Sequence, residues 1–253
     1  MTSSTLLTLS GVSKTFGDTV ALAPTDLSIA EGSFVSVVGP SGCGKSTLFN
    51  LIAGLLAPDD GAIEINGSNV VGSTGHVGYM LQKDLLVPWR TVLDNITMVA
   101  RLTRSVTDAD RAQATAIARR YGLGDFLNHY PKALSGGMRQ RVAFMRTLVT
   151  PHPLLLLDEP FGALDAQTRL EMQQWLLDVW RESGRTVLFI THDVDEAIFL
   201  SDRIIVMSPR PGRVVADLAN PIPRPRDFDS LTTQAFVEQK STIMKLLHGD
   251  RRA

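Results

Sequence analysis

This sequence of 253 residues contains only one cysteine, Cys43. A single cysteine excludes a disulfide within the chain, and it leaves no cysteine cluster that could bind a metal. Histidines do not supply such a cluster either, because their spacing along the chain is not that of metal ligands. The five are His76, His129, His152, His192 and His248.

Long apolar runs are also missing. The longest, residues 51–57, is interrupted by Gly54 and is far shorter than the ~18 apolar residues that a membrane-spanning helix needs. Residues 1–10 lack the basic segment and the apolar core of a secretory signal. We therefore expect the chain to stay in the cytosol.

The sequence has almost no net charge. The formal value is −1, with 20% charged and 44% hydrophobic residues, which is typical of a globular domain. This balance gives no electrostatic footprint for nucleic acid, so no nucleic-acid partner is predicted. At ~150 residues per domain, the length fits one large domain or a domain with a sizeable insertion.

The clearest pattern is a glycine-rich loop between a predicted strand and a predicted helix. Residues 34–38 are apolar and predict a buried strand, and residues 48–56 predict a helix. The loop between them reads Gly39-Pro40-Ser41-Gly42-Cys43-Gly44-Lys45-Ser46-Thr47. Strand, G-x-x-x-x-G-K-[ST] and helix is the context of a phosphate-binding loop.

Each part of this loop has its own chemistry. Glycines let backbone N–H groups close around an anion, and the new helix directs its unpaired N–H groups to the same point. Lys45 is expected to reach the β- and γ-phosphates, and the Ser46 hydroxyl to bind Mg²⁺. Cys43 is interpreted as a small residue that fits the turn, with a thiol that bound nucleotide would shield.

Two carboxylates follow a second apolar strand. Residues 154–157 are four leucines, and Asp158 and Glu159 come directly after them. Such a strand is typical of a parallel sheet buried on both faces, and ligands bind beyond the carboxyl ends of its strands. Asp158 therefore suits Mg²⁺ coordination together with Ser46. Glu159 is placed to polarise an attacking water.

Two further segments are candidates for the same site. Leu134, Ser135, Gly136 and Gly137 open a helix predicted to run to about residue 150, with Ser135 as its N-cap. From these residues alone, it is either a plain capped helix or a second helix start that binds an anion. His192 follows the predicted strand 186–190 at the same sheet edge, which favours a phosphate contact.

The rest of the chain predicts a scaffold of strands and helices. We expect a small antiparallel β unit over residues 5–38, with Phe16 just before a turn, where an aromatic ring can stack on a purine or simply pack in the turn. Further expectations are a strand at 62–65 before the tight turn Asn66-Gly67, a strand at 77–80, helices from about 91 to 130 with a capping pair at Thr107 and Asp110, and a helix capped by Asp165.

The last third predicts a capping-box pair at Asp193 and Glu196 and strands at 203–207 and 214–216. Residues 220–227 are rich in proline and arginine and predict an extended linker, followed by a helix over 228–248. The arginines near the end favour a solvated tail over an interaction surface. They are Arg224, Arg226, Arg251 and Arg252.

Together these motifs resemble the ATP-binding subunits of ABC transporters over residues 5–220. The Leu-Ser-Gly-Gly segment at 134–137 is the most specific part, between the phosphate loop and the carboxylate strand and with His192 last. The resemblance implies an α/β, P-loop NTPase fold of the ABC type, with an antiparallel β subdomain and a helical insertion at about 83–134. Residues 221–253 would form a linker and a C-terminal helix, whose role the sequence does not reveal.

The resemblance also implies roles for single residues. Phe16 would stack on adenine, Glu159 would be the catalytic base and His192 the γ-phosphate switch. Gln82 would contact Mg²⁺ and water and sense the membrane partner, and Asp165 would signal across a dimer. Position 16 is Phe where Tyr is commoner, and Met138 stands where Gln is commoner; neither departure affects the predicted ATPase.

Residues 85–95, the Arg-Pro-Gly-Arg turn at 210–213 and the Pro-Arg-Pro-Arg segment at 223–226 are similar to one branch of the family. That branch comprises importers of nitrate, sulfonates, taurine and pyrimidine precursors. With one phosphate loop and one Leu-Ser-Gly-Gly segment, the chain is expected to form a head-to-tail homodimer. Its other expected partners are integral membrane permease subunits and, indirectly, an extracytoplasmic solute-binding protein.

These partners imply a peripheral location at the cytoplasmic face of the cell membrane. The main alternative is a soluble ABC ATPase that acts on ribosomes or DNA, but such proteins usually carry two cassettes or a long coiled coil. A P-loop kinase is a third possibility, which would leave residues 134–137 and His192 unexplained. The transported solute is not readable from the sequence.

Overall fold

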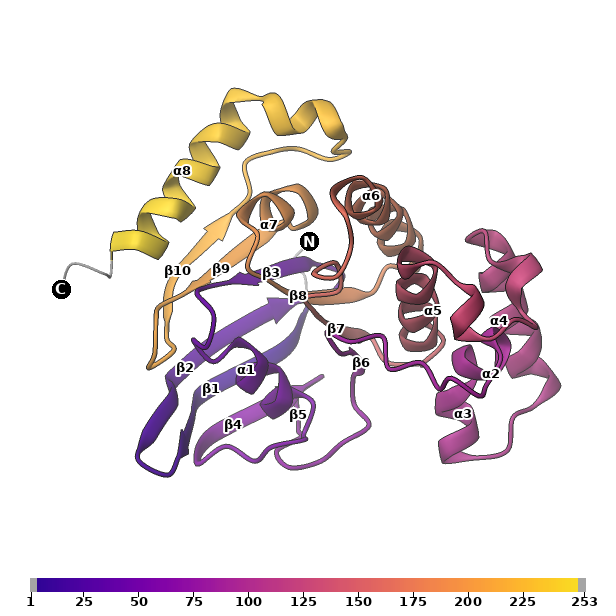
Figure 1. The fold of residues 1–253 in the computed structure, drawn as a ribbon. Coiled ribbons are helices and arrows are strands. Elements are labelled where there is room, and N and C mark those ends of the chain that lie inside the picture. Colours follow the sequence, from indigo (N-terminus) through magenta and orange to yellow (C-terminus); the bar gives the residue numbers. More distant parts are fainter. Residues whose placement is uncertain (1–3, 250–253) are drawn as a thin grey trace. The chain divides into compact units, whose positions relative to one another are not determined.

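The computed structural model describes residues 4–249, so Arg251 and Arg252 lie outside the described residues. The chain divides into two compact units, and each is described by itself. One comprises Met1–Val77 together with Gln173–Ala253, and the other comprises Gly78–Met172. Figure 1 shows the elements of both.

The first unit contains an antiparallel sheet in the order β2-β1-β4-β5. Its strands are β1 (Thr5–Phe16), β2 (Thr19–Ala30), β4 (Asp60–Ile65) and β5 (Ser68–Asn69). β1 and β2 pair along most of their length but change register several times. The predicted turn between β4 and β5 is confirmed, with Asn66 and Gly67 both at positive φ, as a tight hairpin turn requires.

A second set of strands in this unit is mainly parallel. It comprises β3 (Phe34–Val38), β8 (Thr186–Thr191), β9 (Arg203–Met207) and β10 (Val214–Ala219). β3 lies between β8 and β9 and is parallel to both, while β10 pairs antiparallel to β9. Every residue of β3 and of β8 is buried. Parallel strands buried on both faces place their carboxyl ends at one edge, where ligands bind.

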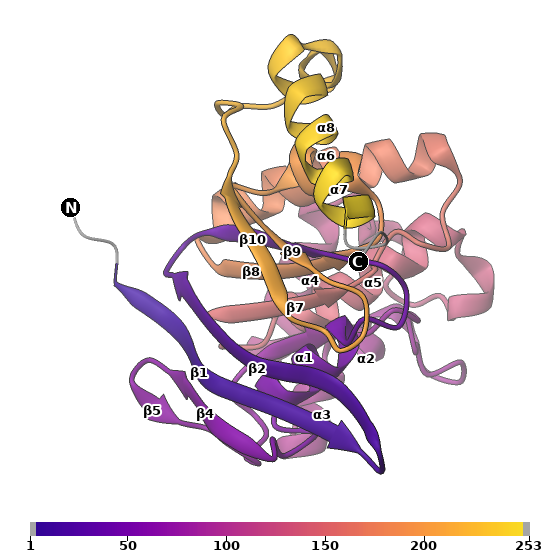
Figure 2. The same cartoon turned by 90° about the vertical axis from the view of Figure 1, so that its left-hand side faces the viewer.

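The helices of this unit are α1 (Lys45–Ile52), α7 (Val194–Leu200) and α8 (Gln234–Gly249), with a 3₁₀ turn at Phe228–Thr232. The C-terminal part of α6 (Ala166–Ser183) also belongs to it. α8 packs against α7 (Figures 1 and 2). The Phe34 ring meets Trp180 of α6 edge-on, with 5.6 Å between the ring centroids.

The second unit has one parallel strand pair, β6 (Gly78–Met80) with β7 (Leu154–Asp158). α5 (Gly136–Leu148) packs against β6 and also against α2 (Val92–Ile96). The other helices are α3 (Met98–Thr103), α4 (Asp108–Arg120) and 3₁₀ turns at Gly124–Phe126 and Pro131–Ala133. Thr107 and Asp110 form the predicted capping box of α4.

Several expectations about elements need correction. Residues 5–38 do not form one antiparallel unit, since β3 pairs only with parallel strands among those described. The first helix begins at Lys45 rather than at residue 48 and ends at Ile52. Asp193 does cap α7, but the Glu196 carboxylate is buried and accepts hydrogen bonds from Thr191 (2.6 Å) and Gln173 (3.1 Å).

The predicted linker at 220–227 contains no helix or strand, but the expectation that its arginines are solvated is wrong, because two of them are anchored. Arg226 is only 3% exposed, and its guanidinium donates to the carbonyls of Ile222, Phe199 and Ser201. Arg224 donates to Asp202 (2.6 Å) and stacks over the Trp180 ring. These side chains fasten the segment before α8 to the end of α7 instead of forming a solvated tail.

Burial and the nearby charge of Arg224 lower the pKa of Arg226 to about 10, so the guanidinium remains charged at neutral pH. We predict that Arg226→Ala lowers the free energy of unfolding by about 3 kcal/mol, since buried carbonyls then lose their donors. Urea unfolding measures this change. Arg181→Ala, at a side chain that is 52% exposed, is the control and should change it by less than ~0.5 kcal/mol. Equal effects of the two variants would contradict the anchoring role of Arg226.

Candidate nucleotide-binding site

The predicted phosphate loop connects β3 to α1 within the first unit. Two of its glycines have backbone angles that other residues rarely adopt, φ 75° at Gly42 and φ 101° at Gly44. Gly44 is also the N-cap of α1, and a side chain there would meet the carbonyl oxygen of Ala21 at 2.6 Å. The glycines thus permit a tight loop whose backbone runs directly into a helix start.

Lys45 lies inside this loop. Its ammonium donates to the carbonyls of Gly39 (2.8 Å) and Pro40 (3.0 Å), and the residue is buried. Cys43 Sγ lies 3.7 Å from the same nitrogen. Cys43 itself is only 1% exposed, so the expectation that nucleotide shields its thiol is wrong: the protein already covers it.

Phe16 and His192 are the other predicted site residues of the first unit. Phe16 ends β1 and is 47% exposed, with the Lys14 ammonium 5.7 Å from its ring centroid. His192 is exposed directly after β8. The backbone around it is fixed, because Thr191 Oγ1 accepts from the Asp193 N–H at 3.0 Å. His192 therefore projects from the carboxyl end of a buried parallel strand.

The two carboxylates lie at the end of β7 in the second unit. Asp158 is the last strand residue and is 7% exposed. Burial raises the pKa of Tyr79 far above its usual value, and the nearby Asp158 carboxylate is the second cause of this shift. Glu159 has a φ of 44°. A positive φ at a non-glycine residue stores backbone strain and marks many functional sites.

Gln82 and Glu159 are brought together within this unit. The Gln82 amide Nε2 donates to Glu159 Oε2 at 3.1 Å. Gln82 comes two residues after the end of β6, which pairs in parallel with β7. Parallel pairing therefore explains why residues 77 positions apart meet at one sheet edge.

The Leu-Ser-Gly-Gly segment forms the start of α5. Ser135 is the N-cap, and its hydroxyl accepts from the Met138 N–H at 3.3 Å. Gly136 is half-buried, and Gly137 is buried under Thr168 of α6. A side chain at Gly137 would come within 2.8 Å of the Thr168 methyl carbon. Glycine at this position is thus needed for the close approach of α6.

Asp165 caps the start of α6 as predicted. Its carboxylate accepts from the Thr168 N–H (3.0 Å) and from the Thr168 hydroxyl (2.7 Å). These hydrogen bonds lower the pKa of Asp165. Thr168 therefore touches both Asp165 and Gly137, which brings two predicted site segments of the second unit together.

The predicted donors suit a magnesium nucleotide chemically. Mg²⁺ prefers hydroxyl, amide and carboxylate oxygens, and Ser46, Gln82 and Asp158 supply one of each. Within residues 4–249 there is no cluster of three His, Cys, Asp or Glu side chains that could hold a metal by themselves. In the same range no helix is both long and apolar enough to span a membrane.

A family model described as ABC transporter matches residues 22–162, more than half of the chain. The chain belongs to the ABC transporter family. Among its relatives, the Taurine import ATP-binding protein TauB of Yersinia pestis is 44% identical over 214 residues, which is 85% of this chain and 84% of the relative. The protein of the same name from Rhizobium johnstonii is 42% identical over 240 residues, 92% of each chain. A putative ATP-binding protein of Brucella abortus is 47% identical over 215 residues, 83% of this chain and 81% of the relative.

Solved ABC transporter structures share the fold. The dimeric structure of a bacterial ABC transporter cassette is 32% identical and has a TM-score of 0.73, covering 88% of this chain and all of the other. The same cassette has been solved in a dimeric post-hydrolysis state with ADP and Pi. These findings confirm the predicted ABC-type α/β fold and an ABC transporter subunit that binds and hydrolyses ATP. None of the relatives named here is described as a non-transport ATPase.

Sequence reasoning missed the residues that hold the segment after Gln82 in this ABC subunit. Arg146 of α5 donates to the carbonyls of Asp84 (2.6 Å) and Leu85 (2.9 Å), and Arg139 pairs with the Asp84 carboxylate at 3.2 Å. The helix that begins at Ser135 thereby anchors the chain next to Gln82. These pairs lie 55 to 62 residues apart, and no local pattern connects them.

Tyr79 was also missed, although it lies on β6 beside the carboxylate strand.

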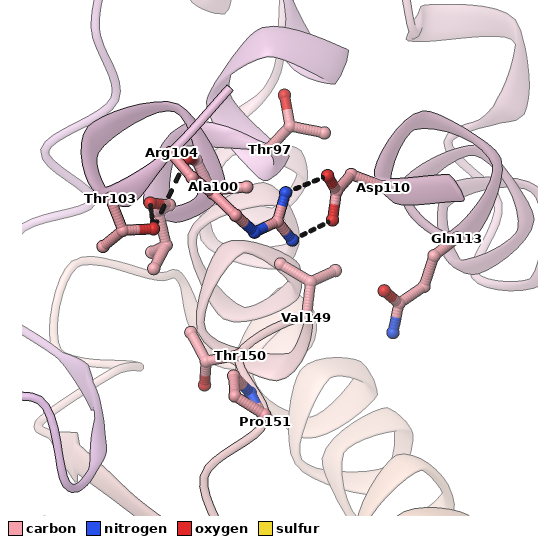
Figure 3. Close-up of a pocket in the computed structure, with 10 residues that line it drawn as sticks. Thr97, Ala100, Thr103, Arg104, Asp110, Gln113, Val149, Thr150 and Pro151 are labelled. Atoms are coloured by element: carbon pink, nitrogen blue, oxygen red, sulfur yellow. Dashed lines mark hydrogen bonds and ion pairs between the residues drawn. The ribbon is translucent and has the colours of Figure 1, made fainter. Parts of the chain in front are cut away.

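A cavity of about 170 Å³ lies among α3, α4 and the end of α5. Figure 3 shows Arg104 and Asp110 in its lining, where the two terminal guanidinium nitrogens donate to the two carboxylate oxygens at 2.6 and 2.7 Å. No predicted ABC site residue lines this cavity, so we assign it to the scaffold.

The lowered pKa of Asp165 predicts a pH-dependent stability. A carboxylate with a depressed folded-state pKa stabilises the fold above its ordinary pKa of about 3.9, and this contribution is lost as the pH falls through the folded value. Asp165→Asn retains a good N-cap but loses the charge. We expect it to be less stable than the parent at neutral pH and to approach the parent as the pH falls through the lowered pKa of Asp165.

Urea midpoints at several pH values measure this difference. Asp178→Asn is the matched control, since Asp178 lies later in α6 and pairs with Arg181 at 3.4 Å in solvent. A difference between Asp165→Asn and the parent that stays constant down to acidic pH would show that the charge of Asp165 is irrelevant to stability.

Proposed function

We propose that this chain is the ATP-hydrolysing subunit of an importer for small sulfonate-like solutes, with taurine as the first candidate. The observation that carries the proposal is the similarity to taurine import ATP-binding proteins, 42% to 44% identity over 85% to 92% of this chain. The predicted site residues offer the groups that such a subunit needs to bind a magnesium nucleotide and to hydrolyse it. Nitrate and pyrimidine precursors remain in the wider class of solutes to be tested.

In this proposal the first unit binds the nucleotide. Lys45 exchanges the carbonyls of Gly39 and Pro40 for the β- and γ-phosphates, and the backbone N–H groups from Ser41 to Thr47 hold the phosphate oxygens. Phe16 stacks on the adenine, which its exposed ring supports. His192 contacts the γ-phosphate from the end of β8.

Ser46, Gln82 and Asp158 would hold Mg²⁺. The ion neutralises charge on the phosphate oxygens when it is bound. Tyr79 would hold the Asp158 carboxylate in place, because the side chains of the two residues are hydrogen-bonded to each other. Asp158 is buried at the strand end, so its carboxylate has little freedom to turn away.

Glu159 is the proposed catalytic base, which orients the attacking water and accepts its proton. Its backbone is held at a positive φ, and its carboxylate accepts from Gln82. A side chain fixed from both ends in this way is preorganised for one direction of attack. The strain at Glu159 is consistent with this role.

The nucleotide is proposed to lie between two copies arranged head to tail. Ser135, Gly136 and Gly137 of one copy would cover the γ-phosphate held by the other copy, and Asp165 would signal across the interface. The dimeric structure of a related cassette supports this arrangement. Closure of the dimer would then drive separate permease subunits, and hydrolysis would reopen it.

These partners place the chain at the cytoplasmic face of the cell membrane as a peripheral subunit. A permease would bind it directly, and an extracytoplasmic solute-binding protein would act through that permease. Nucleic acid is not among the proposed partners, in keeping with the net charge of −1.

Glu159→Gln tests the proposed chemistry. The variant keeps the shape of the side chain but cannot accept the proton, so we expect ATP binding to persist while kcat falls on the order of 100-fold or more. Trapped ATP should make the variant accumulate as a dimer in size-exclusion chromatography. A monomeric Glu159→Gln protein with parental turnover would refute the assignment of the base.

Transport itself is tested in cells that lack the chain. The parental gene should restore uptake of labelled taurine, and Lys45→Ala should not, because the phosphates lose their charged partner. Lys132→Ala, at an exposed lysine of the second unit, is the control and should transport normally. ATPase activity without restored uptake of taurine, other sulfonates or nitrate would point to a non-transport ATPase.

A further inference from the structure

The turn between β9 and β10 lies against the phosphate loop in the first unit. It comprises residues 208–213, and Gly212 within it pairs with β2: its N–H donates to the Ala21 carbonyl (3.2 Å), and its carbonyl accepts from the Ala23 N–H (2.8 Å). Figure 2 shows this connection beside β2. The turn is therefore fixed to the sheet and can serve as a support.

This turn contacts two successive carbonyls of the phosphate loop. The Arg210 guanidinium donates to the Gly42 carbonyl from Nε (3.3 Å) and from Nη2 (3.2 Å). The next carbonyl, that of Cys43, lies directly against Gly212, where an added Cβ would come within 1.9 Å of the oxygen. One contact is a charge-assisted hydrogen bond and the other is close packing.

These two contacts determine where the neighbouring N–H groups point. In a trans peptide the C=O and the following N–H point in opposite directions. With the carbonyls of Gly42 and Cys43 directed at the turn, the N–H groups of Cys43 and Gly44 are directed away from it, into the loop. The Cys43 N–H donates to the Pro40 carbonyl inside the loop at 3.3 Å, and in the proposed site a phosphate oxygen would replace this carbonyl.

We propose that Arg210 is a positioning residue of the nucleotide site, which holds the Gly42 carbonyl outward so that loop N–H groups face the phosphates. The part about phosphates rests on the proposed function, whereas the support of the loop does not. Arg210 acts through the Gly42 peptide and takes no part in the chemistry. It should therefore influence nucleotide affinity and loop order far more than turnover.

Global stability should depend little on this side chain. Arg210 is exposed, and exposed charged groups contribute little to the free energy of unfolding. Arg210→Ala is thus expected to fold normally. Arg213→Ala is the matched control, because it removes the same charge from the same turn at another exposed position.

The first experiment measures loop opening without nucleotide. Cys43 is the only cysteine of the chain and is buried in the loop, so its labelling by a thiol reagent reports local opening. In the full-length protein, Arg210→Ala should raise the labelling rate about fivefold, because the contact that it removes is worth about one hydrogen bond. Arg213→Ala should leave the rate unchanged. Equal rates in Arg210→Ala and the parent, or the same increase in Arg213→Ala, would overturn the proposal.

The second experiment separates affinity from turnover. We expect Arg210→Ala to raise KM for ATP about five- to tenfold with kcat changed less than twofold, and Arg210→Lys to recover part of the loss. The KM ratio should persist between low and high salt, because screening weakens distant charge attraction and not a short contact. A ratio that falls to one at high salt would overturn the support role in favour of simple attraction.

The two experiments also distinguish this inference from the proposed function. A parental protein that binds no ATP overturns the proposed function, while faster labelling of Arg210→Ala would still show that Arg210 holds the loop. Parental ATP hydrolysis with an unchanged KM in Arg210→Ala overturns only the role of Arg210.

Discussion

Backbone N–H groups can converge on one anion only if the carbonyls of the same peptides are held facing outward. Much of the first unit serves this constraint. β3 delivers the loop from a sheet position buried on both faces, and α1 continues from it without an intervening turn. β2 and the turn at 208–213 then occupy the outer side, through Ala21, Gly212 and Arg210. The backbone of the phosphate loop is thus held in its functional geometry mainly by backbone groups of β2 and of the turn.

The second unit relies on helix starts and strand ends instead. Ser135 and Asp165 each cap a helix, and Thr168 connects the two caps by touching Asp165 and lying over Gly137. Glu159 and Gln82 meet at the ends of two parallel strands. Ser135 and Asp165 accept hydrogen bonds from backbone N–H groups of their own helix starts, whereas Gln82 and Glu159 are joined by a hydrogen bond between side chains 77 residues apart. A small unit can therefore fix several polar groups without a large polar core.

The sequence was most informative where chemistry and local structure coincide. The phosphate loop, the leucine strand before Asp158, the Thr107 cap and the Asn66-Gly67 turn depend on neighbouring residues, and the structure has all four elements. Arg226 and Glu196 were misjudged, because their partners are distant carbonyls and side chains that only folding brings near. The support from Arg210 depends on a turn about 170 residues away, which no local pattern reveals.

The side-chain amide of Gln82, which follows β6, has a further consequence. Gln82 directs its nitrogen at the Glu159 carboxylate, and an amide carries a donor on one side of its carbon and an acceptor on the other. The amide oxygen therefore lies on the side away from Glu159, where a cation or a water hydrogen is its natural neighbour. Glutamate here would set two negative charges side by side, and lysine would offer no acceptor. In the proposed site, Gln82 would thus donate to the Glu159 carboxylate through its nitrogen and bind Mg²⁺ through its oxygen.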